Sequence, residues 1–125
     1  MKYFLVFILT CLLTNLVNAN WNIYSCKASK FIAVLENENK DVLKDGEVNF
    51  IFRIDETNLK LILSGDLMFS SNPQFSIFAM NDDFLMAKSP TLHGSIYYDF
   101  INKTLSYSSN NLGFIDAMFA KCKLN

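Results

Sequence analysis

The chain is poor in the residues that most often build catalytic and metal sites. Its 125 residues include one histidine, His93, and three cysteines. Imidazole catalysis would depend on that one side chain, which stands before Gly94-Ser95 in an apparent loop that lacks a Gly-x-Ser-x-Gly motif. Zinc needs three or four nitrogen, sulfur or carboxylate ligands, and no such set is in evidence. We therefore expect no metal, no cofactor and no catalytic residue.

Acidic side chains are too sparse in any one segment for a calcium loop. The modest clusters at 41–47 and 81–83 lack the Asp-x-Asp-x-Asp-Gly spacing that this ion requires. Both clusters are typical of polar turns. Together with His93, Asp82 and Asp83 are the most visible candidates for a small hydrolase, the functional class that the sequence favours least.

Runs of one charge sign are also absent. Eleven basic and twelve acidic residues are spread along the chain, for a net charge of −1. Nucleic-acid binding requires a stripe of lysine and arginine that neutralises phosphates, so we expect no nucleic-acid partner. The same balance argues against an electrostatic membrane anchor.

Long hydrophobic runs are missing except at the N-terminus, where residues 3–13 are apolar apart from Thr10. A membrane-spanning helix needs about 20 apolar residues, and this run is about half as long. Met1-Lys2 before it and Val17-Asn18-Ala19 after it are typical of a secretory signal peptide. We predict that residues 1–19 are removed, leaving one secreted or periplasmic domain over 20–125 with no membrane span.

The mature chain would contain two of the three cysteines, because Cys11 belongs to the predicted leader. Its lipidation is a disfavoured alternative, since Thr10 stands where lipoprotein signals place a small residue. Cys26 and Cys122 remain, and an even count in an exported chain predicts one disulfide. A redox-active pair is the weaker alternative, because no Cys-x-x-Cys motif occurs. A bridge requires Cα atoms about 4.4 to 6.8 Å apart, so the first and last elements should be neighbours.

Apolar and polar residues alternate through 48–64, as expected for two strands with one buried face. The polar segment 55–58 predicts a hairpin loop, with Ile54 opposite Leu59. A second hairpin is predicted over 96–107. Its turn is Asn102-Lys103, and Phe100 faces Leu105.

Weaker strand patterns occupy 21–27, 31–36, 75–80, 84–88 and 114–123. The last segment is ambiguous, because its apolar residues also fit helical spacing. We favour a strand there, with a short C-terminal helix as the alternative. The prediction is an all-β fold, a small antiparallel β-barrel or two-sheet β-sandwich of about seven or eight strands.

Aromatic residues are abundant, with twelve phenylalanines, five tyrosines and one tryptophan. Most of these rings should fill a small core. Phe75, Phe78 and Phe84 lie between the two clear hairpins and are candidates to line a pocket for an apolar ligand. In a eukaryotic host, the sequon Asn102-Lys103-Thr104 would make Asn102 a glycosylation site.

These patterns favour an exported, non-catalytic binding or interaction domain over a structural or accessory envelope protein. The expected partner is an apolar small molecule or another envelope protein. The two partners make different demands on the fold. A carrier would turn its apolar side chains inward around a cavity, whereas a docking module would expose them as a patch.

Overall fold

The computed structural model describes residues 21–35, 38–41, 48–65, 69, 71–89, 93–111 and 114–125. The predicted leader, including Cys11, lies outside these residues. The described part contains nine strands, and within it no helix is long and apolar enough to cross a membrane. The strands are β1 (Trp21–Leu35), β2 (Glu38–Asp41), β3 (Asn49–Asp55), β4 (Lys60–Gly65), β5 (Gln74–Met80), β6 (Phe84–Ser89), β7 (Gly94–Asp99), β8 (Thr104–Asn111) and β9 (Phe114–Leu124).

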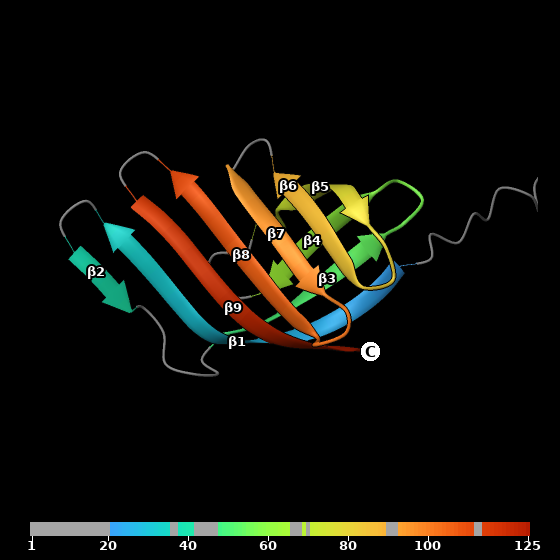
Figure 1. Cartoon of the computed structure of the whole chain (residues 1–125), viewed down its shortest axis with the longest axis horizontal. Helices are drawn as coiled ribbons and strands as arrows, with labels where there is room; N and C mark the ends of the chain where they lie inside the picture. The colour runs from blue at the N-terminus through green and yellow to red at the C-terminus, as the bar shows by residue number, and fades with distance from the viewer. Residues whose placement is uncertain are drawn as a thin grey trace, which may run out of the picture.

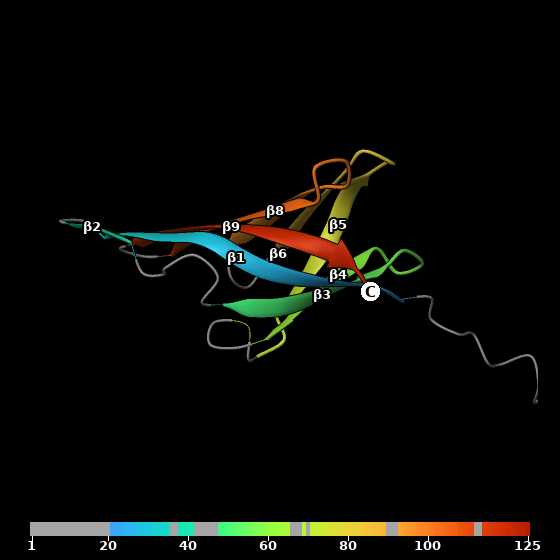
Figure 2. The same cartoon turned by 90° about the horizontal axis from the view of Figure 1, so that it is seen from below.

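Eight of these strands form a closed antiparallel barrel, which confirms the predicted all-β class and excludes the sandwich (Figure 1). Neighbours pair in the order β1-β3-β4-β5-β6-β7-β8-β9, and pairing of β9 with β1 completes the circle. Figure 2 shows β1 running between β9 and β3 at this closure. Beyond the barrel, β2 pairs with the last residues of β1.

The C-terminal segment is a strand, so the alternative of a C-terminal helix is wrong. It pairs with β1 along most of its length, which helical spacing could not allow. Met118, Ala120 and Cys122 point into the barrel, while Ile115 and Phe119 stay exposed. Cys122 stands directly opposite Cys26, and the predicted disulfide joins them. Their Cα atoms are 4.0 Å apart, just below the expected range, because the two residues are direct partners in neighbouring antiparallel strands.

Both clear hairpins form, but each register differs from the prediction by two residues. Ile54 pairs with Leu61 rather than Leu59, and Tyr98 rather than Phe100 pairs with Leu105. A shift of two residues keeps every side chain on its predicted face. The loops are therefore four residues long, 56–59 and 100–103.

An aspartate before each loop explains the shifted registers. Asp55 accepts hydrogen bonds from the backbone N–H and the side-chain Nδ2 of Asn58, and Asp99 does the same for Asn102. The residue after each asparagine has positive φ, 51° at Leu59 and 56° at Lys103. The repeated Asp-x-x-Asn segment thus closes both loops by local side-chain bonding.

Two groups of aromatic rings fill the barrel. At one end, Phe52 stacks on Tyr24 with centroids 4.5 Å apart and meets the edge of Tyr98 at 4.9 Å. At the other end, Phe69 packs against Phe50 at 5.0 Å and against Tyr107 at 5.9 Å. Buried leucine, isoleucine and alanine side chains belong to the same core.

Candidate functional site

The three phenylalanines predicted to line a pocket do not lie together. Phe75 points into the barrel and contacts Tyr107, with 1% of its surface exposed. Phe78 points outward and is 58% exposed, under Lys88 Nζ at 5.1 Å from the ring centroid. Phe84 is also on the outside, where it stacks on Tyr97. Only Phe78 lines one of the hollows described below.

The outer surface of β5 to β9 carries a groove of about 320 Å³. The pairing register of the strands places the lining residues in two cross-strand rows. The first row is Met86, Tyr97, Ser106 and Phe119, and the second row is Lys88, Ser95, Ser108 and Ala117. Small side chains in the second row leave the hollow, and Phe78 borders it from β5.

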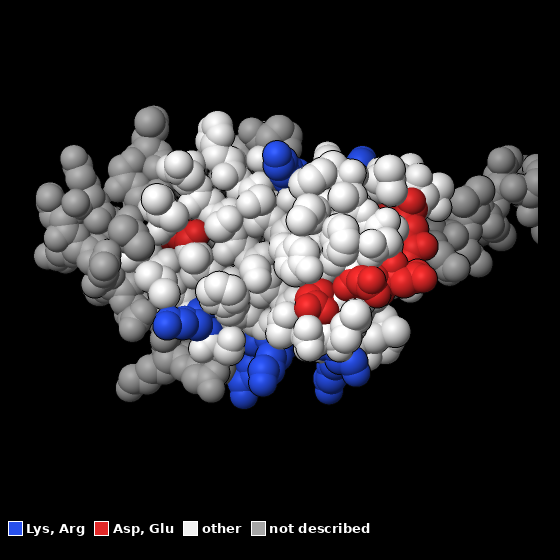
Figure 3. Space-filling model, in the orientation of Figure 1, with Lys and Arg blue, Asp and Glu red and all other residues white. Residues whose placement is uncertain are grey.

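Two hydroxyl groups on the floor of this groove form a hydrogen bond with each other. The hydroxyl groups of Ser95 and Ser108 lie 3.1 Å apart and bond to each other. Large apolar side chains at the border are open to solvent, with Phe119 49% and Tyr97 39% exposed. Figure 3 shows this face as largely uncharged, with one acidic patch in its left part, acidic residues at its right end and basic residues at its upper and lower edges. The groove therefore presents apolar surface with few free polar groups.

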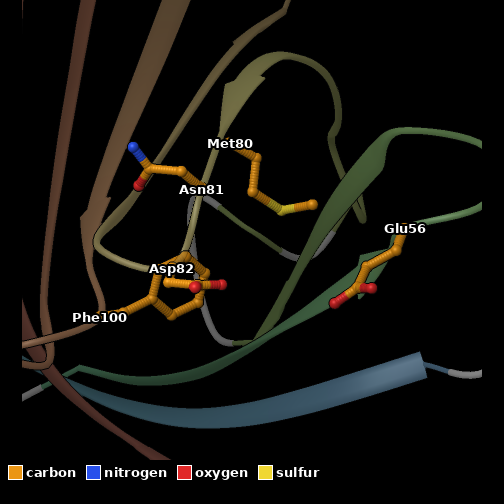
Figure 4. A pocket seen from close by; sticks show the side chains of 5 residues that line it. All are labelled: Glu56, Met80, Asn81, Asp82 and Phe100. Atoms are coloured by element: carbon orange, nitrogen blue, oxygen red, sulfur yellow. The ribbon is translucent and has the colours of Figure 1, made fainter.

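A second hollow of about 440 Å³ lies at one end of the barrel, which we call the mouth. Figure 4 shows its lining side chains: Glu56, Met80, Asn81, Asp82 and Phe100. Asn81 belongs to a tight turn, where its Oδ1 accepts hydrogen bonds from the backbone N–H groups of Asp83 and Phe84. This turn is the polar turn that the sequence predicts at 81–83.

Buried tyrosines beneath the mouth stay neutral near physiological pH. Burial, with smaller effects from Tyr24 and Asp99, raises the pKa of Tyr98 to about 12. Burial and the negative charge of Glu56 also raise the pKa of Tyr24. Neither hydroxyl group is therefore suited to act as a general base.

No family model, curated protein or solved structure matches this chain. Its function must therefore be argued from its own residues.

The residues considered for catalysis do not converge. His93 is exposed, has a φ of 46° and precedes β7, in a hollow that it shares with Lys88 and Ser95. Asp82 lines the mouth instead. Among the described residues, no three histidine, cysteine or acidic side chains are placed to hold a metal ion. Asn102 is exposed in its turn, and its predicted glycosylation stays a prediction.

Sequence reasoning missed the groove because its residues come from five strands. Outward-facing serines at 95, 106 and 108 are visible as alternating positions. That they form one floor beside Phe119 depends on the pairing of β8 with β9. The one feature of the sequence that could have indicated the groove is the presence of large apolar residues at strand positions that face solvent.

Proposed function

We propose that the mature chain is an exported, non-catalytic interaction domain of the periplasm or the cell exterior. It docks on another protein by inserting apolar side chains of that partner into the groove over β5 to β9. The observation that carries this proposal is the largely uncharged outer face, on which Phe78, Tyr97 and Phe119 are exposed around small residues. Soluble domains seldom leave such a patch uncovered.

The composition and charge of the face favour a protein partner. Interface cores are enriched in aromatic residues and methionine and depleted in charge, and charged residues form their rims. Met86 and aromatic rings surround the small floor residues of the groove, and Lys88 is the one charged side chain among its described lining residues. Most other charged residues visible on this face lie towards its edges (Figure 3). Because Ser95 and Ser108 bond to each other, the floor favours an apolar guest over a polyhydroxylated one.

The filled interior makes the carrier alternative less attractive. Phe52, Phe75 and Tyr98 are almost fully buried against other rings, so an apolar ligand inside the barrel would have to displace them. The disulfide is consistent with an oxidising compartment, as export would require.

Selection of random peptides displayed on phage tests this proposal. We expect enriched peptides with aromatic and aliphatic side chains, whose affinity falls at least about tenfold for Phe78→Ser and Phe119→Ser. Ile101→Ser and Leu124→Ser are matched controls, because those side chains are 68% and 61% exposed outside the groove. Peptides that bind all four variants equally well, or no enrichment at all, would contradict the proposal.

A further inference from the structure

A separate part of the barrel surface gathers lysines that are far apart in sequence. Outward-facing residues of β9, β1, β3 and β4 form two adjacent cross-strand rows. The first row is Lys123, Ser25, Ile51 and Ser64, and the second is Lys121, Lys27 and Asn49. The three lysines therefore stand together at the β9 side of both rows.

These lysines are not neutralised within the described part of the chain. Lys27 and Lys121 are direct cross-strand partners, and all three lysines are exposed. None of them forms an ion pair with a described carboxylate. Like charges directly opposite each other in a sheet are destabilising, so the arrangement is unfavourable for the isolated domain.

Polar side chains border a hollow beside the lysines. Its volume is about 360 Å³, and it is lined by Ser25, Cys26, Asn49, Phe50, Ile51, Ser64 and Gly65. Lys123 and Lys27 do not line it, but they are the direct cross-strand partners of Ser25 and Asn49, which do. Ser25 donates a hydrogen bond to Asn125 Oδ1, whereas the amide of Asn49 is exposed. Hydroxyl and amide groups beside lysine ammonium groups are the donors that bind phosphate oxygens.

Ser64 gives an independent indication of a ligand. Its Oγ is buried and has no hydrogen-bond partner among the described residues. An unpaired buried hydroxyl is unfavourable by about 1 to 3 kcal/mol in proteins generally. The residue itself lines the hollow, but its Oγ is covered in the structure, so contact between this oxygen and a guest requires a change of the χ1 rotamer.

We propose that this hollow binds a phosphate-bearing group. Lys27, Lys121 and Lys123 would supply the positive charge, while Ser64 and Asn49 would donate hydrogen bonds to the phosphate oxygens. Free phosphate and a phospholipid headgroup share this chemistry, and the experiment distinguishes them. The inference does not depend on the groove or its partner.

NMR titration of the mature, disulfide-bonded protein tests the site. One arm adds inorganic phosphate, and the other adds vesicles of phosphatidylcholine with or without phosphatidylglycerol. We expect saturable amide shifts at residues 25, 27, 49 and 64 with phosphate. The double variant Lys27→Gln/Lys121→Gln and the single variant Ser64→Ala should each weaken binding about tenfold or more. Lys60→Gln/Lys88→Gln and Ser108→Ala are matched controls, because none of these residues lines the hollow or pairs with a residue that lines it.

Each outcome decides the proposal. Saturable phosphate binding that only the site variants weaken supports it. Binding to phosphatidylglycerol vesicles alone, with the same sensitivity to the site variants, also supports it and identifies a lipid headgroup as the source. Binding to neither probe, or equal losses in the site and control variants, would overturn it.

Discussion

Phe75 and Phe78 are three residues apart, yet they have opposite environments. Odd and even positions of a strand point to opposite faces, so Phe75 enters the barrel and Phe78 faces solvent. Because the two rings lie on opposite faces of the strand, they cannot line one pocket. The prediction of a shared pocket was based on aromatic content and did not take this alternation into account. A bulge between Ile77 and Ala79 further adjusts the end of β5.

Alanine substitutions at these two positions should separate core from surface. Phe75→Ala should lower the free energy of unfolding by about 3 to 5 kcal/mol, because it leaves a cavity beside Tyr107. Phe78→Ala should change it by less than about 0.5 kcal/mol. Urea denaturation of both variants gives these values. Similar losses at both positions would mean that Phe78 belongs to the core.

The loop aspartates should make stability depend on pH in a defined direction. Hydrogen bonds from Asn58 lower the pKa of Asp55, first from its side chain and then from its backbone N–H. The backbone and side chain of Asn102 lower the pKa of Asp99 in the same way. Since the folded pKa values lie below the unfolded ones, the stabilisation is complete above about pH 4 and is lost as the pH falls through the folded values.

The double variant Asp55→Asn/Asp99→Asn should therefore have a lower melting temperature than wild type at pH 7. This difference in melting temperature should vanish in acid. Asp116→Asn is the opposite control. Burial raises the pKa of Asp116, although the hydrogen bond from Ser109 partly offsets this effect, so its charge is unfavourable at pH 7. That variant should melt slightly above wild type at pH 7. A constant difference across the pH range would refute the hydrogen-bonding account of the loops.

At the scale of elements, the alternation of apolar residues predicted the hairpins and their faces but not their registers. The hydrophobic pattern is unchanged by a shift of two residues, so it cannot distinguish the two pairings. The deciding interactions are the local bonds from Asn58 to Asp55 and from Asn102 to Asp99. A repeated Asp-x-x-Asn segment would have been the signal for both loops.

The loop between β7 and β8 offers a test at this scale. Lys103 has a φ of 56°, a conformation that glycine adopts without a Cβ clash. Lys103→Gly should therefore stabilise the domain by up to about 1 kcal/mol, while Lys103→Ala should give no gain. Thermal melting of the two variants checks this. Equal melting temperatures for the Gly and Ala variants would show that backbone strain at this position does not affect stability.

For the whole molecule, two cysteines alone predicted that the first and last elements of the domain lie side by side, and β1 does pair with β9. The groove and the lysines could not be predicted, because both depend on cross-strand register. Lysines at 27 and 121 look unrelated in a chain with mixed charge. Only the closed barrel makes them neighbours.

Removal of the disulfide should show how much the closure contributes. The bridge spans a sequence separation of 96 residues, for which chain entropy gives a stabilisation of about 4 to 5 kcal/mol. Cys26→Ala/Cys122→Ala should lose most of this amount in urea denaturation. Wild type in reductant is the control and should lose a similar amount. A loss below about 1 kcal/mol would mean that strand pairing alone fixes the closure.

Hydroxyl-radical footprinting tests most directly whether the outer groove is the docking surface. It compares the purified mature domain with the same protein in the secreted or envelope fraction of the cells that make it. We predict that Phe78 and Phe119 oxidise rapidly in the purified domain and become protected in the native fraction, while Ile101 and Leu124 oxidise equally in both. Unchanged oxidation of Phe78 and Phe119 would contradict the account, because it would mean that nothing covers the groove.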